Sequence, residues 1–162
     1  MKFQTRKGFT LIELIIFMGI FSILVFILTD IFVNSLKTKA ASESTAIVNQ
    51  DSRFIFFKLM SDINNANTIV YPELGSSETS LTIVLYGQTE TFQLNNGNLE
   101  LVDSSGTHVL NSQKSIVANS LFTRLGNIDG KSSIKISLTV QSKELINNTP
   151  EIINLETTIG QR

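Results

Sequence analysis

The chain has 162 residues, enough for one domain and one membrane segment. Its 13 basic and 14 acidic residues give a net charge of −1, and the sequence has no basic run, so an autonomous nucleic-acid-binding protein is a poor fit. The absence of cysteine excludes a disulfide framework and thiolate metal sites.

The chain begins with a short basic leader, residues 1–8, which ends in Gly8. An apolar stretch starts at once with Phe9, and its fifth residue is the acid Glu13. An ionisable group inside an apolar helix is energetically costly and needs a partner. Glu13 is therefore the strongest candidate for a functional side chain.

Residues 9–33 are composed to span a membrane. They include eighteen Phe, Leu, Ile or Val, and at about 1.5 Å per residue they can cross a hydrocarbon core of about 30 Å. At about −0.4 kcal/mol each, these side chains contribute about −7 kcal/mol, which outweighs about +3 kcal/mol for one misplaced acid. Insertion is favoured. Asp30 lies near the outer end, where we expect it to reach the far interface.

The basic residues Lys2, Arg6 and Lys7 hold the N-terminus in the cytoplasm and direct the remainder outward. A secretory signal peptide is one alternative, but such peptides are cut at small residues after the apolar core, and residues 34–36 (Asn-Ser-Leu) make a poor site. An uncleaved signal anchor is another alternative. We expect a single-pass membrane protein with its head outside the cytoplasm.

The run Lys7-Gly8-Phe9-Thr10-Leu11-Ile12-Glu13 resembles the processing signature of type IV prepilins and pseudopilins. The resemblance implies that a prepilin peptidase cuts between Gly8 and Phe9 and methylates the Phe9 amine. It also implies that Glu13 pairs with the N-terminal amine of a neighbouring subunit and guides entry into a filament. The alternative is that Glu13 reaches the cytoplasmic headgroups. The implied partners are the peptidase, other pilins or pseudopilins, an inner-membrane assembly platform and membrane lipid.

Neither Pro nor Gly occurs between Phe21 and Tyr71, so we expect one helix from about Phe9 to about Asn67. Residues 34–69 form its amphipathic continuation, and the piece 54–66 meets the head. The helical period places Lys58, Asp62 and Asn65 outside the apolar face of this helix. The residues on the apolar face are Val48, Ser52, Ile55, Phe56, Leu59, Met60, Ile63, Ala66 and Val70. The aromatic run 53–57 is expected to pack as core, with an adhesive surface as the alternative.

Residues 70–162 have the period-two pattern of an antiparallel β head with five to eight strands. Expected strands cover 81–86, 89–94, 98–102, 107–110, 133–140 and 152–159, and 116–125 is either strand or irregular. Asn-Gly at 96–97 predicts a hairpin, 103–106 a turn, and 147–150 a break. The fold class is α+β, with one long N-terminal helix packed on the sheet, and it is type IV pilin-like. The stretch 54–66 and the order of hairpin, loop and final strand also resemble J-type minor pseudopilins.

No catalytic, cofactor or metal site is predicted in the head. The segment 126–132 has three residues between its glycines where a phosphate-binding loop has four, so we expect a turn containing Asp129. His108 is expected on a surface strand, outside any catalytic triad. Asp103 and Asp129 alone do not predict a calcium site. The scattered basic residues form no nucleic-acid patch.

These observations predict a non-catalytic minor pilin or pseudopilin of a type IV pilus-like or type II secretion-like filament. The major pilin of such a filament is the alternative, and a membrane-tethered enzyme is a remote one. Protein secretion, pilus assembly and DNA uptake by competent cells all remain open as the role of the machine.

Overall fold

The computed structural model describes residues 8–126, 130–146 and 148–162. The internal contacts divide the chain into two units, Met1–Ala40 and Ala41–Arg162. In the first unit, the described residues are helical from Leu11 onward, and residues 8–10 precede the helix. The second contains the remainder of the same helix and all of the described strands.

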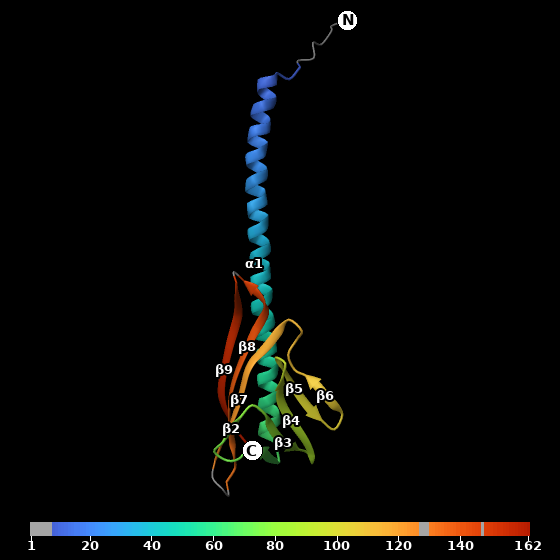
Figure 1. The fold of residues 1–162 in the computed structure, drawn as a ribbon, viewed down its shortest axis with the longest axis vertical. Helices are drawn as coiled ribbons and strands as arrows, with labels where there is room; N and C mark the ends of the chain where they lie inside the picture. Colours follow the sequence, from blue (N-terminus) through green and yellow to red (C-terminus); the bar gives the residue numbers. More distant parts are fainter. Residues whose placement is uncertain (1–7, 127–129, 147) are drawn as a thin grey trace. The chain divides into compact units, whose positions relative to one another are not determined.

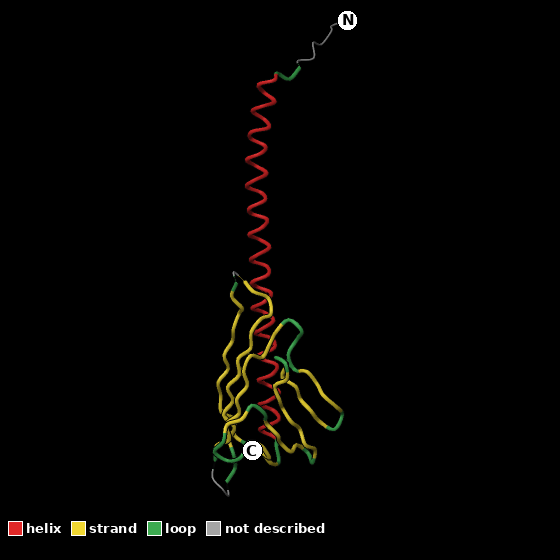
Figure 2. Tube along the Cα trace, in the orientation of Figure 1, coloured by secondary structure: helices red, strands yellow, loops and turns green. Residues whose placement is uncertain are grey.

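Helix α1 runs from Leu11 to Asn65 and is drawn in red in Figure 2. It has the length and continuity expected from a segment without proline, but it ends two residues before Asn67. Strand β1, Thr68–Tyr71, follows almost directly. The placement of Val70 on the helix face was therefore wrong, since Val70 lies in β1 with an exposed side chain. Its neighbour Ile69 is the buried residue of that strand.

Five strands form an antiparallel sheet in the order β1-β3-β4-β5-β6. Figure 1 labels β3, β4, β5 and β6 of this sheet. Its further strands are β3 (Leu81–Leu85), β4 (Gln88–Asn95), β5 (Asn98–Asp103) and β6 (Gly106–Val109). All four lie where alternation predicted strands. The strand expected over 81–86 stops one residue early, because Tyr86 turns with a φ of 51°.

The other four described strands form a second antiparallel sheet in the order β2-β7-β8-β9. They are β2 (Ser77–Glu78), β7 (Ser115–Leu125), β8 (Ser133–Ile146) and β9 (Thr149–Gly160). The predicted break at 147–150 is shorter than expected, and β9 already includes Pro150. Proline is tolerated there because β9 is an edge strand. The described residues thus contain nine strands in two sheets, one strand more than the upper expectation.

The Asn-Gly hairpin is confirmed in detail. Asn95 pairs with Asn98, and Asn96 and Gly97 both have positive φ, 48° and 79°, as a tight two-residue turn requires. Gly97 is needed for a second reason. A Cβ at this position would lie 2.7 Å from Cγ2 of Ile116, so the turn packs directly against β7.

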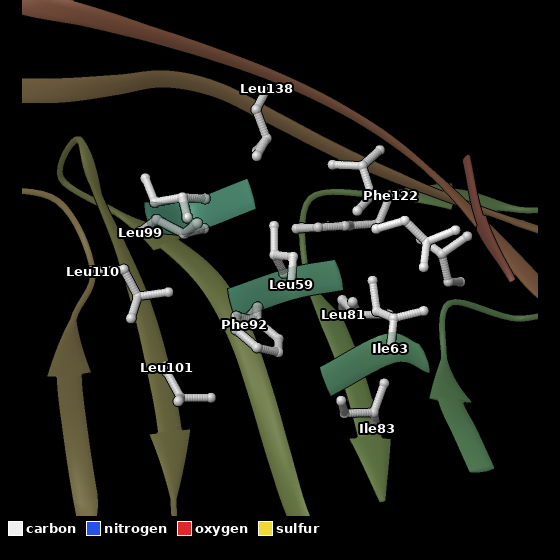
Figure 3. Packing of buried hydrophobic residues seen from close by; sticks show 14 of the residues in the cluster. Leu59, Ile63, Leu81, Ile83, Phe92, Leu99, Leu101, Leu110, Phe122 and Leu138 are labelled. Carbon is white, nitrogen blue, oxygen red and sulfur yellow. The ribbon is translucent and has the colours of Figure 1, made fainter. Parts of the chain in front are cut away.

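The core of the second unit lies between the two sheets, with the C-terminal part of α1 inserted into it. Figure 3 shows Leu59 and Ile63 of the helix between Phe92 of one sheet and Phe122 and Leu138 of the other. All five side chains are almost completely buried. The expectation that the helix segment 54–66 completes the core of a small β head is therefore confirmed, and the helix serves both sheets.

A buried carboxylate joins the helix to the connection between the sheets. Oδ2 of Asp51 accepts hydrogen bonds from Ser112 N at 2.9 Å and from Ser115 Oγ at 2.5 Å. Asn111 continues the network: its Oδ1 accepts from Leu99 N at 2.9 Å, and its Nδ2 donates to Ser115 O at 3.2 Å. These bonds fix the β6–β7 connection to both α1 and β5.

A second buried acid was misplaced by the helical period. Asp62 was expected outside the buried face, yet it is only 5% exposed. It forms an ion pair with Nζ of Lys58 at 2.7 Å, one helical turn away. Burial, reinforced by the Asp62 carboxylate, raises the pKa of Glu90 above its ordinary value, while Lys58 acts in the opposite direction.

The aromatic run 53–57 only partly follows the core expectation. Ile55 is fully buried and Phe56 is half-buried, as predicted. Phe54 and Phe57, however, are 55% and 63% exposed. Their placement in the core was wrong, because the sheets cover one side of this helical segment and leave the other side open.

Candidate processing and assembly site

The expected cleavage site lies in an open segment just before α1. Apart from the neighbours of Gly8 in the chain, no described residue lies within 4 Å of the position that a Cβ would take there, and Phe9 is 83% exposed. The basic leader residues Lys2, Arg6 and Lys7 lie outside the described residues. The peptide bond between Gly8 and Phe9 is thus sterically open to a protease.

Thr10 caps the start of the helix. Its Oγ1 accepts a hydrogen bond from Glu13 N at 3.3 Å, and its carbonyl accepts one from Leu14 N at 3.2 Å. A threonine three residues before a glutamate is the sequence signature of a helix-capping box. The sequence analysis used Thr10 only as part of the family motif, although this spacing already indicated the helix start. The cap fixes where Glu13 lies relative to Phe9.

Glu13 is exposed in the first turn of α1, where the positive end of the helix dipole favours a carboxylate. The structure brings Gly8, Phe9 and Glu13 into one short segment. Within the described residues, no side chain forms an ion pair or hydrogen bond with the Glu13 carboxylate. The geometry therefore leaves this acid available to a group from another molecule.

The apolar part of α1 is exposed along its whole described length. From Leu11 to Val33 its large hydrophobic side chains are all at least 40% exposed. Among the described residues, α1 is the one helix long and apolar enough to cross a membrane, and its spanning segment is not buried in the protein. A water-soluble state would leave this surface in contact with solvent, at a cost proportional to its area.

Two hydroxyl groups in this segment, those of Ser22 and Thr29, are satisfied within the helix. The hydroxyls of Ser22 and Thr29 donate to the carbonyls of Met18 and Val25 at 2.8 and 2.9 Å. Such bonds to the preceding turn allow hydroxyls to lie in hydrocarbon without an unsatisfied donor. They make the apolar helix compatible with both lipid and a bundle of helices.

The hairpin around His108 brings a serine, a histidine and an aspartate together without forming a triad. Ser105 Oγ lies 2.8 Å from Nε2 of His108, and Oδ1 of Asp103 lies 3.6 Å from the same ring nitrogen. In a catalytic triad the carboxylate holds the opposite nitrogen of the ring. Hydrogen bonds from Ser105 lower the pKa of Asp103 and stabilise the turn. His108 lies exposed in β6, as predicted.

No cluster of three or more His, Asp, Glu or Cys in the described part of the chain could hold a metal ion. The predicted turn at 126–132 lies partly outside the described residues, and Asp129 lies wholly outside them. Among the residues that the structure describes, the candidate functional residues therefore lie in the N-terminal segment.

The N-terminal segment matches the protein-family model described as "Prokaryotic N-terminal methylation motif" over residues 4–29. Comparisons with curated proteins and with solved structures gave no match. The matched range contains Gly8, Phe9 and Glu13, and it ends inside the apolar part of α1. The chain therefore carries a prepilin-type N-terminal methylation motif, and its long N-terminal helix with antiparallel sheets is consistent with a type IV pilin-like α+β fold.

Proposed function

We propose that the chain is a non-catalytic minor subunit of a type IV pilus-like or type II secretion-like filament. The observation that carries the proposal is the methylation motif followed by an apolar helical segment, residues 11–33, whose large hydrophobic side chains are all exposed. A protein of this kind needs an apolar environment for its helix both before and after assembly. The resemblance of the head to J-type pseudopilins supports its assignment as a minor subunit.

In this proposal a prepilin peptidase cuts between Gly8 and Phe9 and methylates the new amine. The open backbone at Gly8 and the exposure of Phe9 support access by the enzyme. Removal of residues 1–8 leaves the helix on the mature protein, because the cut precedes the apolar segment. The helix cap at Thr10 lies beyond the cut and is retained.

Before assembly, residues 9–33 span the membrane with the N-terminus in the cytoplasm and the unit Ala41–Arg162 outside. The basic leader supports this direction. On assembly, contacts between the helix and lipid are exchanged for contacts between helices of neighbouring subunits. Because both environments are apolar, the exchange avoids the large cost of moving eighteen bulky apolar side chains into water.

Glu13 acts during this exchange as the partner of the N-terminal amine of a neighbouring subunit. Its exposed position in the first turn and its lack of a side-chain partner among the described residues support this role. A carboxylate and an ammonium group attract each other strongly where water is excluded. Their pairing therefore favours entry of a subunit at one specific depth.

The test is Glu13→Ala in the cells that naturally make the protein, with Glu73→Ala as the matched control on the exposed head. We expect both variants to be cut after Gly8. Glu13→Ala should then be absent from sheared filaments, whereas Glu73→Ala should be incorporated normally. Normal incorporation of Glu13→Ala would remove the assembly role. Filaments composed mainly of this protein would instead assign it as the major subunit.

A further inference from the structure

A groove lies between α1 and β9 within the unit Ala41–Arg162, and we call it the α1–β9 groove. Its volume is about 310 Å³. It is open on the side of the helix that the sheets leave uncovered. Its main lining residues are Ser52, Arg53, Phe56 and Phe57 of α1 and Ile153 and Leu155 of β9.

The groove has the composition of a protein contact surface. Phe57 is mostly exposed, and Phe54 beside it widens the apolar area. Arg53 forms no ion pair or hydrogen bond with any residue that the structure describes. Ser52 is 2% exposed, and its Oγ has no hydrogen-bond partner among the described residues. Exposed aromatic side chains beside an unpaired arginine are typical of protein–protein contact sites.

The same chain exposes a segment with complementary chemistry. The apolar helix over residues 9–33 needs an apolar surface to pack against, and it carries the acid Asp30 near its outer end. Within the described residues, the contact of the Asp30 side chain is with Nδ2 of Asn34 at 3.4 Å, and no cation neutralises it. Among the residues that the structure describes, Asp30 therefore has no counter-ion and Arg53 has no acidic partner.

We propose that the α1–β9 groove receives the apolar helix of a second copy of this chain, with Arg53 paired to Asp30 of that copy. The inference rests on the proposed role as a filament subunit, whether minor or major. It places residue 30 of one copy level with residue 53 of the other, so the two copies are staggered. A contact between two different surfaces of the same protein is head-to-tail, and it produces an open helical filament when its rotation does not close into a ring.

The contact can be tested by disulfide cross-linking, because the chain has no cysteine of its own. Two tagged full-length copies are expressed together in the native cells, one with Asp30→Cys and the other with Arg53→Cys, and filaments are oxidised. The control replaces Arg53→Cys with Lys143→Cys, an exposed cation on β8 outside the groove. We expect about tenfold more mixed dimer for the first pair, since residues held in contact have a high effective concentration.

A charge exchange tests the pairing itself. Arg53→Glu should reduce incorporation into filaments, and the matched change Lys143→Glu should not. Combining Arg53→Glu with Asp30→Lys should restore incorporation, because the pair is rebuilt with its charges reversed. Lys and Asp cost about the same, roughly 3 kcal/mol, at the centre of a membrane helix, so the exchange leaves insertion similar.

The outcomes separate this inference from the proposed function. If the protein is cut after Gly8 and enters filaments, but the pair at 30 and 53 cross-links no better than the control, the groove contact is refuted and the subunit role stands. Cross-linking of Arg53→Cys to another polypeptide, or to a second copy substituted at the same position, also refutes it. An uncut protein absent from filaments refutes the proposed function instead.

Discussion

The carboxylate of Asp51 should be one of the most important polar groups for the stability of the head. It accepts hydrogen bonds from Ser112 N and Ser115 Oγ, and Ser115 is fully buried. A hydrogen bond to a charged group contributes about 1.5–3 kcal/mol, and a buried donor left without an acceptor costs about 1–3 kcal/mol. We expect Asp51→Ala to lower the free energy of unfolding by about 3 kcal/mol.

The assay is urea unfolding of a fragment covering residues 36–162, which contains every residue of the hydrophobic core cluster, followed by circular dichroism. A loss of 3 kcal/mol corresponds to a fall in Tm of roughly 10 °C for a domain of this size. Glu73→Ala, which removes an exposed acid, should change stability by less than about 0.5 kcal/mol. If Asp51→Ala falls within the range of this control, the buried hydrogen bonds do not anchor the helix as described.

Two further predictions concern the sheets. The raised pKa of Glu90 means that ionising this side chain costs folding stability: the cost is absent below the ordinary pKa and complete above the raised pKa of the folded state. Glu90→Gln should therefore stabilise the fragment more at pH 7 than at pH 4 in urea titrations. Equal effects at both pH values would contradict this. Gly97→Ala should destabilise the fragment more than Gly87→Ala does. Both glycines have positive φ, but only at position 97 would a Cβ collide with Ile116. Equal falls in Tm for the two variants would show that the clash is relieved.

Local sequence signals predicted the parts of the fold that depend on local physics. The turn at Asn96-Gly97 needed only residues that tolerate positive φ, and β3 needed only alternation over a few residues. Helix α1 was recognisable because nothing in its sequence interrupts it. By contrast, β2 has two residues, too few for any period to be visible.

Burial of charged groups could not be read from the helix alone. Asp51 is buried because its partners lie 61 and 64 residues away, in the β6–β7 connection and at the start of β7. Asp62 is buried next to Lys58, with which it is paired, and it interacts electrostatically with Glu90 of β4. The helical period locates the apolar residues but does not show which side the sheets cover, so the exposure of Phe57 also required the three-dimensional arrangement.

The candidate processing site was predictable almost entirely from sequence, because Gly8, Phe9 and Glu13 are close in the chain and need no long-range contact. The structure added the helix cap at Thr10, which fixes their local geometry. The groove at Arg53 could not be predicted, since two of its lining residues, Ile153 and Leu155, come from β9, about a hundred residues later.

The most direct measurement is the N-terminal residue of the protein isolated from its native membrane or filaments, determined by mass spectrometry. The account predicts a chain that starts at Phe9 and carries one methyl group on its amine. A chain that retains Met1, or one that starts after the apolar helix near Leu36, would contradict it.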